Sequence, residues 1–287
     1  MAWDRRVGIQ SFFAKKTFLI FLLAVVIFLT SISGVALAYN SRSAKVVLDK
    51  ESGEILYAEN ANARMEMAST TKILTAVCVI ENADIFQEIA IPSAAVGVEG
   101  SSVYLRKGER WKVIDLLYGL MLRSGNDAAV ALALHTSGSI NAFASLMNET
   151  AKRAGAQNSS FVNPHGLHDD AHFTTALDMA RITAYALKNP VFASICAAKV
   201  HSYTKKNGEA TEKGVFYNKN KLLSSYPNAT GVKTGYTKHS GRCLVSSASK
   251  DGKELICVLL NVYDTYGETR ALFDRYFGEE KRAGQNA

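Results

Sequence analysis

Strand-like segments lie near both ends of this 287-residue chain, and helical segments fill the region between them. In the strand-like segments polar and apolar residues alternate with a period of two, whereas apolar residues in the middle recur with helical spacing. The predicted strands are 44–50, 54–59, 200–204, 215–218, 230–236, 242–249 and 254–262. This order predicts one sheet built from both ends of the chain, with helices packed against it.

The predicted helices have recognisable ends. The first runs from Ser69 to about Asn82, and the next two cover 113–122 and 127–136. A fourth begins at a cap at Ser139 and ends at Ala154, and a fifth begins at a cap at Thr174 or Thr175 and ends at Asn189-Pro190. The last runs from Asp264 or Thr265 to Phe277. The run 113–122 is almost wholly apolar but shorter than a membrane span, which favours a buried helix. No internal repeat or low-complexity linker divides the chain, so we predict a single domain over residues 39–287.

The chain has four cysteines, two of which flank a predicted hairpin. Asp251-Gly252 is a strong two-residue turn, which would place position 243 opposite 260 and position 257 opposite 246. Because 243 and 246 differ by an odd number, Cys243 and Cys257 would point to opposite faces of the sheet. We therefore predict no disulfide between them, and buried free thiols at Cys78 and Cys196, which have apolar neighbours.

Ser69 and Lys72 stand where a polar segment passes into an apolar helix. Ser69 is expected at the N-cap or in the first turn, and Lys72 one turn later on the same face. A serine with an amine in reach is an activated nucleophile, and a helix N-terminus adds favourable backbone N–H groups. The pattern alone is weak, because Ser-x-x-Lys also occurs at Ser202/Lys205 and Ser247/Lys250, in strand-like or turn-like polar sequence.

Two further motifs follow in the chain. Ser124-Gly-Asn126 lies in a tight connection between two apolar helices, and Lys233-Thr-Gly235 lies in a predicted strand. Ser-x-Asn recurs once, at Ser139/Asn141, whereas Lys-Thr/Ser-Gly occurs only at Lys233. The ordered triple is therefore far more specific than any of its members.

This triple is a known signature of class A β-lactamases and penicillin-binding proteins. The sequence around it resembles the D-alanyl-D-alanine carboxypeptidases among the low-molecular-mass penicillin-binding proteins, from about Ala44 to Phe277. The resemblance implies an α/β (α+β) fold of the DD-peptidase/β-lactamase type, with an antiparallel five-stranded sheet from both chain ends and a helical middle subdomain. Some relatives also carry a C-terminal β-domain and a membrane-binding helix, and we expect neither here.

The resemblance further implies a serine-type D-Ala-D-Ala carboxypeptidase that trims the terminal D-alanine of peptidoglycan stem peptides through an acyl-enzyme on Ser69. Lys72 would be the base if burial and the second cation, Lys233, keep it neutral. Ser124 would relay the proton to the leaving amine. β-Lactam antibiotics would be covalent inhibitors, and no cofactor would be needed.

Substrate binding is expected at Asn126, Lys233, Thr234, Gly235 and Tyr236. By the same resemblance, Asn126 would hydrogen-bond the peptide amide, and Lys233 with Thr234 would hold the substrate carboxylate. The backbone N–H groups of Ser69 and Tyr236 would form the oxyanion hole. Arg242 and Arg270 are candidates for a further cation at the carboxylate, and the sequence does not decide between them.

A metallohydrolase is a rival hypothesis. The loop 163–172 holds three histidines and two aspartates, residue types that can bind a metal. However, Asn163-Pro-x-Gly-Leu167 and His172-x-Thr-Thr-Ala-x-Asp178 resemble a loop-and-helix segment of the carboxypeptidase family in which no metal takes part. We therefore expect no catalytic metal.

A class A-like β-lactamase and a non-catalytic muropeptide-binding protein are two more hypotheses for a chain with these motifs. The β-lactamase needs a glutamate that activates water for deacylation, and there is none between Ala151 and Glu209. A muropeptide-binding protein without activity would not need the motif residues, which are all present. Both hypotheses are therefore disfavoured.

The first 38 residues resemble an export signal. Basic residues precede the apolar run 18–29, and small residues lead into Ala36-Leu-Ala38, after which cleavage is expected. An uncleaved anchor is the alternative, since 17–38 is long enough to span a bilayer. Either way the rest of the chain is expected outside the cytoplasm, with membrane contact only through this segment. The formal charge of +7 includes no basic run of the kind that binds nucleic acid.

Overall fold

The computed structural model describes the backbone of residues 43–283 and the side chains of residues 43–278. The predicted signal peptide or anchor, residues 1–38, lies outside the described residues. The described residues all belong to one compact unit, which begins at Ser43. Within the described part, no single helix is long and apolar enough to cross a membrane. Helices α4 (Asn126–Ser137) and α5 (Ile140–Arg153) are long and apolar enough only when taken together, and the pair is bent by 86°.

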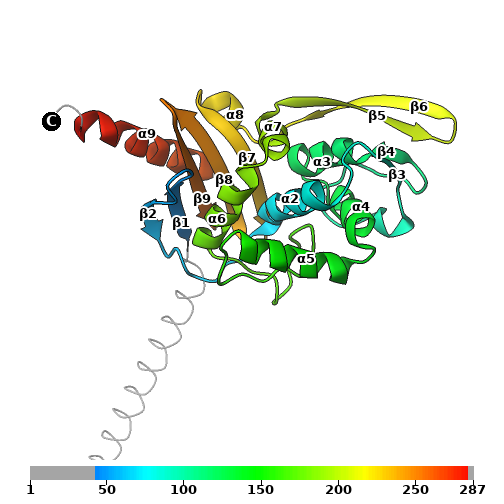
Figure 1. Cartoon of the computed structure of the whole chain (residues 1–287), viewed down its shortest axis with the longest axis horizontal. Helices are drawn as coiled ribbons and strands as arrows, with labels where there is room; N and C mark the ends of the chain where they lie inside the picture. The colour runs from blue at the N-terminus through cyan, green and yellow to red at the C-terminus, as the bar shows by residue number, and fades with distance from the viewer. Residues whose placement is uncertain (1–42, 284–287) are drawn as a thin grey trace, which may run out of the picture. The chain divides into compact units, whose positions relative to one another are not determined.

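A five-stranded antiparallel sheet joins the two ends of the described chain, as predicted (Figure 1). Its strand order is β2-β1-β9-β8-β7, with β1 at Ala44–Asp49, β2 at Ile55–Glu59, β7 at Ala229–Thr237, β8 at Gly241–Lys250 and β9 at Lys253–Leu260. The first strand lies directly beside the last, since Ala44 is paired with Leu260. The family resemblance thus gave the correct main sheet.

The turn between β8 and β9 sets the register of the sheet's centre. Asp251 and Gly252 both have positive φ, 52° and 84°, as a two-residue hairpin turn of this kind requires. Ser246 is paired with Cys257, which is the predicted register. Cys243 packs in the core that contains the helices, and Cys257 packs in the core on the other face. All four cysteines are buried and free, as predicted.

Each face of this sheet is covered. The inner face packs against the helical middle through side chains such as Val46, Val245 and Val258. The other face packs against α9 (Thr265–Ala283) through Val47, Leu259 and Phe273, among others. Because successive strand residues point to opposite faces, β9 supplies apolar residues to both cores.

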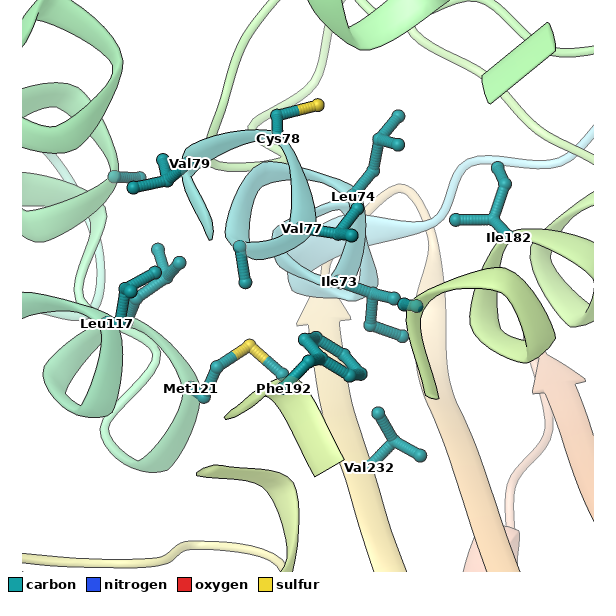
Figure 2. Close-up of a cluster of buried hydrophobic side chains, with 14 of the residues drawn as sticks. Ile73, Leu74, Val77, Cys78, Val79, Leu117, Met121, Ile182, Phe192 and Val232 are labelled. Carbon is teal, nitrogen blue, oxygen red and sulfur yellow. The ribbon is translucent and has the colours of Figure 1, made fainter. Parts of the chain in front are cut away.

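Helix α2 (Lys72–Asn82) is the centre of the helical middle. Every residue from Lys72 to Val79 is buried, and its side chains meet those of neighbouring helices and of β7 (Figure 2). The surrounding helices are α3 (Val113–Leu122), α4, α5, α6 (Ala176–Leu187) and α7 (Pro190–Ala197). The predicted caps at Ser139 and Thr175 are present, each accepting a hydrogen bond from a backbone N–H in the first turn of its helix.

A second sheet makes the prediction of one sheet wrong. It is antiparallel and four-stranded, in the order β3-β4-β5-β6, with strands at Glu88–Ala90, Arg110–Lys112, Val200–Asn207 and Ala210–Tyr217. The long β5–β6 hairpin joins the helical region through β4, and the rings of Trp111 and Tyr203 stack at 4.7 Å. Alternation identified β5 and β6 as strands but carries no information about which strand they pair with.

Candidate active site

Ser69 lies in η1 (Ala68–Thr71), a short 3-10 turn directly before α2. It does not cap the helix, which begins at Lys72. The hydroxyls of Thr70 and Thr71 donate to the carbonyl oxygens of Met67 and Ala68, at 2.7 and 2.8 Å, and so stabilise the turn. Lys72 Nζ is thereby placed 2.9 Å from Ser69 Oγ.

The Lys72 amine is fully buried and has three oxygen neighbours. Besides Ser69 Oγ, these are Asn126 Oδ1 at 2.7 Å and the His165 carbonyl oxygen at 2.6 Å. Burial holds the pKa of Lys72 well below its ordinary value, and the positive charge of Lys233 lowers it further. A neutral amine has two N–H groups and one lone pair; if the N–H groups donate to Asn126 and His165, the lone pair faces the Ser69 hydroxyl.

Ser124 and Asn126 lie where α3 passes into α4, the tight connection predicted from sequence. Ser124 has a φ of 63°, an uncommon value for a residue other than glycine, and is buried. Asn126 is buried too, and both ends of its side-chain amide are used: Oδ1 accepts from Lys72, and Nδ2 donates to the Glu99 carbonyl oxygen at 2.5 Å. Asn126 is therefore a positioning partner of Lys72 as well as a predicted substrate ligand.

Strand β7 carries the third motif past the Ser69 turn. A Cβ added to Gly235 would lie 3.1 Å from the Met67 carbonyl oxygen and 3.2 Å from the Ser69 nitrogen, so glycine lets the strand approach the turn this closely. Lys233 is buried, and its amine donates to the Thr234 carbonyl oxygen at 2.9 Å. Thr234 is half-buried, and Tyr236 is exposed.

Burial lowers the pKa of Lys233 to about 7, and the charge of Lys219 contributes in the same direction. Lys219 also lowers the pKa of Lys72, so its charge acts on both lysines of the motifs. Lys219 was not predicted, because a lone exposed lysine outside any motif gives no sequence signal. The two arginines proposed from sequence are placed differently: Arg242 donates to the Tyr263 carbonyl oxygen at 3.0 Å, and Arg270 lies on α9, beyond the other face of the sheet.

The histidines of loop 163–172 do not converge on a common point. His165 lends its carbonyl oxygen to Lys72, while its ring Nδ1 accepts from the backbone N–H of Leu167 at 3.1 Å. His172 is buried between the Thr71 hydroxyl, 2.8 Å away, and the N–H of Val162. Burial lowers the pKa of both rings to about 4, so both are neutral at pH 7. The loop therefore supports the Ser69 turn, and its three histidines do not form a metal site together.

Gly166 fits this loop against the turn. Its φ is 88°, and an added Cβ would lie only 1.9 Å from the Ala68 carbonyl oxygen. The predictive signals here were the Asn163-Pro-x-Gly-Leu pattern and its family resemblance. The Glu99 and His165 carbonyls were missed, because backbone acceptors are independent of residue type.

The family model for D-alanyl-D-alanine carboxypeptidase matches residues 33–264. The chain belongs to this family. Among named relatives, the D-alanyl-D-alanine carboxypeptidase DacF of Bacillus subtilis (strain 168) is 36% identical over 228 residues, covering 78% of this chain and 58% of that protein. The D-alanyl-D-alanine carboxypeptidase of Streptomyces sp. (strain K15) is 34% identical over 227 residues, covering 74% of this chain and 78% of that protein.

Solved structures of DD-peptidases share the fold. The crystal structure of the Streptomyces K15 DD-transpeptidase aligns with a TM-score of 0.78 at 30% identity, covering 82% of this chain and 96% of that one. The D-alanyl-D-alanine carboxypeptidase DacD from Francisella tularensis aligns with a TM-score of 0.73 at 30% identity, covering 80% and 68% respectively. The DD-peptidase fold expected from the sequence motifs is thus confirmed.

Proposed function

We propose that this member of the D-alanyl-D-alanine carboxypeptidase family is an active serine-type enzyme that removes the terminal D-alanine of peptidoglycan stem peptides. The observation that carries the proposal is the buried Lys72 amine, with its pKa held low, 2.9 Å from the Ser69 hydroxyl. Burial of an amine that forms no ion pair favours its neutral form, which can accept a proton.

In the acylation step, Ser69 Oγ attacks the carbonyl carbon of the penultimate D-alanine while Lys72 accepts the hydroxyl proton. The carbonyl oxygen becomes an oxyanion, for which the backbone N–H groups of Ser69 and Tyr236 are the proposed donors. Losing one such donor typically costs about 3–4 kcal/mol of transition-state stabilisation. The C–N bond then breaks, and Ser124 passes the proton to the departing amine of D-alanine.

The substrate carboxylate needs positive charge beside the serine. Lys233 and Thr234 are the proposed ligands, and Lys219 is the further cation, because its charge acts on both Lys72 and Lys233. A bound carboxylate would raise the pKa of Lys233, whose amine donates to the Thr234 carbonyl oxygen and forms no ion pair with a carboxylate of the described residues. Asn126 is the proposed partner of the peptide amide.

Deacylation distinguishes this proposal from a β-lactamase. Departure of D-alanine leaves room for water at the ester, whereas a penicilloyl group keeps its leaving nitrogen tethered. No glutamate occurs in residues 151–208 to activate another water. We therefore infer that β-lactams act as long-lived covalent inhibitors. Peptidoglycan lies outside the cytoplasmic membrane, so the proposed activity requires an extracytoplasmic catalytic part, in agreement with the export signal predicted at the N-terminus.

The test is intact mass after incubation with labelled penicillin, paired with D-alanine release from a diacetyl-Lys-D-Ala-D-Ala peptide. Wild type should gain one acyl group and release D-alanine over many turnovers, and Ser69→Ala should do neither. Ser202→Ala is the matched control, since it alters a second Ser-x-x-Lys pair, on β5. Rapid multiple-turnover penicillin hydrolysis without D-alanine release would show that the β-lactamase hypothesis is correct.

A further inference from the structure

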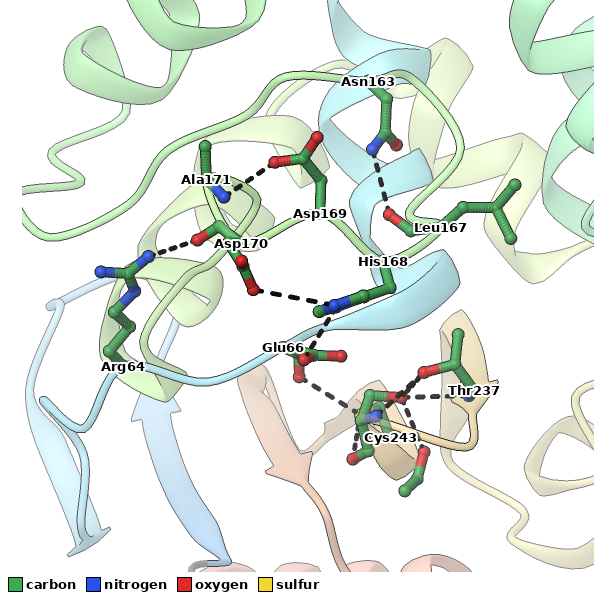
Figure 3. A network of polar contacts seen from close by, with 12 residues as sticks. Arg64, Glu66, Asn163, Leu167, His168, Asp169, Asp170, Ala171, Thr237 and Cys243 are labelled. Carbon is green, nitrogen blue, oxygen red and sulfur yellow. Dashed lines mark hydrogen bonds and ion pairs between the residues drawn. The ribbon is translucent and has the colours of Figure 1, made fainter.

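Three side chains with metal-binding atoms gather beside the active site and have no part in the proposed reaction: Glu66, His168 and His239. One potential ligand atom from each lies within 4.8 Å of the other two. Glu66 Oε1 is 3.0 Å from His168 Nδ1, and His168 lies between the carboxylates of Glu66 and Asp170 (Figure 3). The rings of His168 and His239 stack with centroids 4.0 Å apart.

We propose that Glu66, His168 and His239 bind a divalent transition-metal ion such as Zn²⁺, with water in the remaining position. Two imidazoles and one carboxylate are a ligand set that Zn²⁺ takes, at about 2.0–2.2 Å from each atom. Such bond lengths put tetrahedral ligand atoms roughly 3.4 Å apart, so the wider separations in this cluster, which reach at most 4.8 Å, have to shorten by up to about 1.4 Å. The three residues come from distant parts of the sequence, and no single motif contains them.

One local rearrangement is required. The two imidazole rings are within 9° of parallel, and the lone pairs of stacked rings do not point at one ion. The exposed ring of His239 therefore has to turn until its nitrogen faces the Glu66 carboxylate. Side chains at the surface change rotamer on the picosecond-to-nanosecond timescale, so this movement is not a barrier to binding.

The backbone around the ligands is already fixed. Arg64 donates to the Asp170 carbonyl oxygen, and Met65 and Thr174 exchange two backbone hydrogen bonds, which tie the Glu66 segment to the His168 loop. On the other side, Thr237 and Ser240 exchange hydrogen bonds that close the turn containing His239. Only side chains have to be ordered when the ion binds, which limits the entropic cost.

Each ligand belongs to a segment that carries part of the active site. Glu66 precedes the Ser69 turn, His168 shares its loop with the His165 carbonyl that binds Lys72, and His239 follows the β7 strand of Lys233. An ion here would join these segments and would bind the folded chain far better than the unfolded one. Its role would be structural, so the proposal does not depend on the proposed peptidase reaction.

The test uses the metal-free full chain without a polyhistidine tag. Calorimetric titration with Zn²⁺ should show one site, and Zn²⁺ should raise the melting temperature. Co²⁺ should give the visible absorption bands of a site with imidazole ligands, a readout that does not involve activity. No saturable binding of Zn²⁺ or Co²⁺ would overturn the proposal.

Variants locate the site. His168→Gln and His239→Gln should each weaken Zn²⁺ binding by about 100-fold or more, since even changes beyond the ligands cost 10–100-fold. The matched control is His201→Gln, which alters another histidine–carboxylate pair, 2.7 Å from Asp115, and should bind like wild type. Melting of the metal-free variants checks that each is folded. Binding that survives both substitutions, or that is equally weakened in the control, would refute this site.

Discussion

The pairs Ser69/Lys72 and Ser202/Lys205 have the same spacing but opposite electrostatic surroundings. Lys72 is fully buried and has no ion pair with any described carboxylate, so burial lowers its pKa. Burial alone would lower the pKa of Lys205 as well. Hydrogen bonds to Glu109, at 2.6 Å, and to Glu212 outweigh the effect of burial, and the pKa of Lys205 is raised. The same motif therefore has a lysine with a lowered pKa in one place and a lysine with a raised pKa in the other.

Backbone geometry adds a second difference. The 3-10 turn before α2 brings Ser69 and Lys72 to the same side, with 2.9 Å between Oγ and Nζ. Ser202 and Lys205 lie in β5, where residues three apart point to opposite faces. The proposed nucleophile–base pair thus depends on both the turn and the absence of an ion-paired carboxylate at the amine, and the four-residue pattern specifies neither.

The largest loss of acylation rate is expected for Lys72→Arg, because the arginine guanidinium stays protonated in proteins and cannot act as a base. Acylation by penicillin should fall by about 10³-fold or more, near the upper range for general base catalysis. Lys205→Arg is the control and should acylate at the wild-type rate. The measurement is the second-order acylation rate constant from time-resolved intact mass. A Lys72→Arg variant within tenfold of wild type would rule out lysine as the base.

A smaller, pH-dependent effect is expected for Asn126→Asp, which gives Lys72 the kind of partner that Lys205 has. A carboxylate at this distance raises an amine pKa by about 1–3 units, so acylation at pH 7 should fall about 100-fold. In wild type the base works when deprotonated, so kcat/KM should rise with pH through an apparent pKa below 10.5, which belongs to the coupled Lys72–Lys233 pair.

The pH–rate profile is the decisive measurement for this variant. The rising limb of Asn126→Asp should lie at higher pH than that of wild type, and activity should recover towards alkaline pH. Asn126→Ala is the control, because it loses the Lys72 contact without adding charge. If the rising limb of Asn126→Asp does not move, the charge argument fails.

The smallest effect on catalysis is expected for Lys205→Met, which leaves the acylation rate unchanged but destabilises the fold. Glu109 is fully buried; burial raises its pKa, but hydrogen bonds from Lys205 and Trp111 outweigh this and lower it. Removing Lys205 should cost about 2–3 kcal/mol of unfolding free energy, because the buried carboxylate loses a charged partner.

The pH dependence of unfolding checks the cause. Since the folded pKa of Glu109 is below its unfolded value, the stability that it contributes is present above pH 4.5 and is lost as pH falls through the folded pKa. Denaturant unfolding at pH 7 and at acidic pH should therefore show a difference between wild type and Lys205→Met that shrinks in acid. An equal difference at both pH values would point to lost packing instead.

Local sequence predicted those parts of the fold that local physics determines. The Asp251-Gly252 turn gave the correct β8–β9 register, and the apolar run 113–122 became α3 with the same bounds. The second sheet was missed because it depends on the pairing of β5 with the three-residue strand β4, about 90 residues away in the chain. Pairing between distant strands is decided by packing, which alternation does not encode.

In the candidate site, too, the sequence predicted the motif side chains but not the contacts that distant backbone segments supply. Ser69, Lys72 and Asn126 were predicted to belong together, and the structure joins them by hydrogen bonds. Their roles in catalysis stay predictions. The sequence did not reveal the Glu99 and His165 carbonyls that hold Asn126 and Lys72, because any residue can supply a backbone oxygen.

The pairing of β1 with β9 has a consequence for biogenesis. The chain is made from its N-terminus, so β1 and β2 exist for some time before β9, about 200 residues later, is available to pair with β1. At roughly 5–20 residues per second this interval is about 10–40 s, during which one edge of β1 has no partner. The main sheet, in which β9 and β8 connect β1 to β7, therefore cannot be complete before β9 has been made. The surroundings of Ser69 are therefore completed late, after the strand that carries Lys233 has joined the sheet.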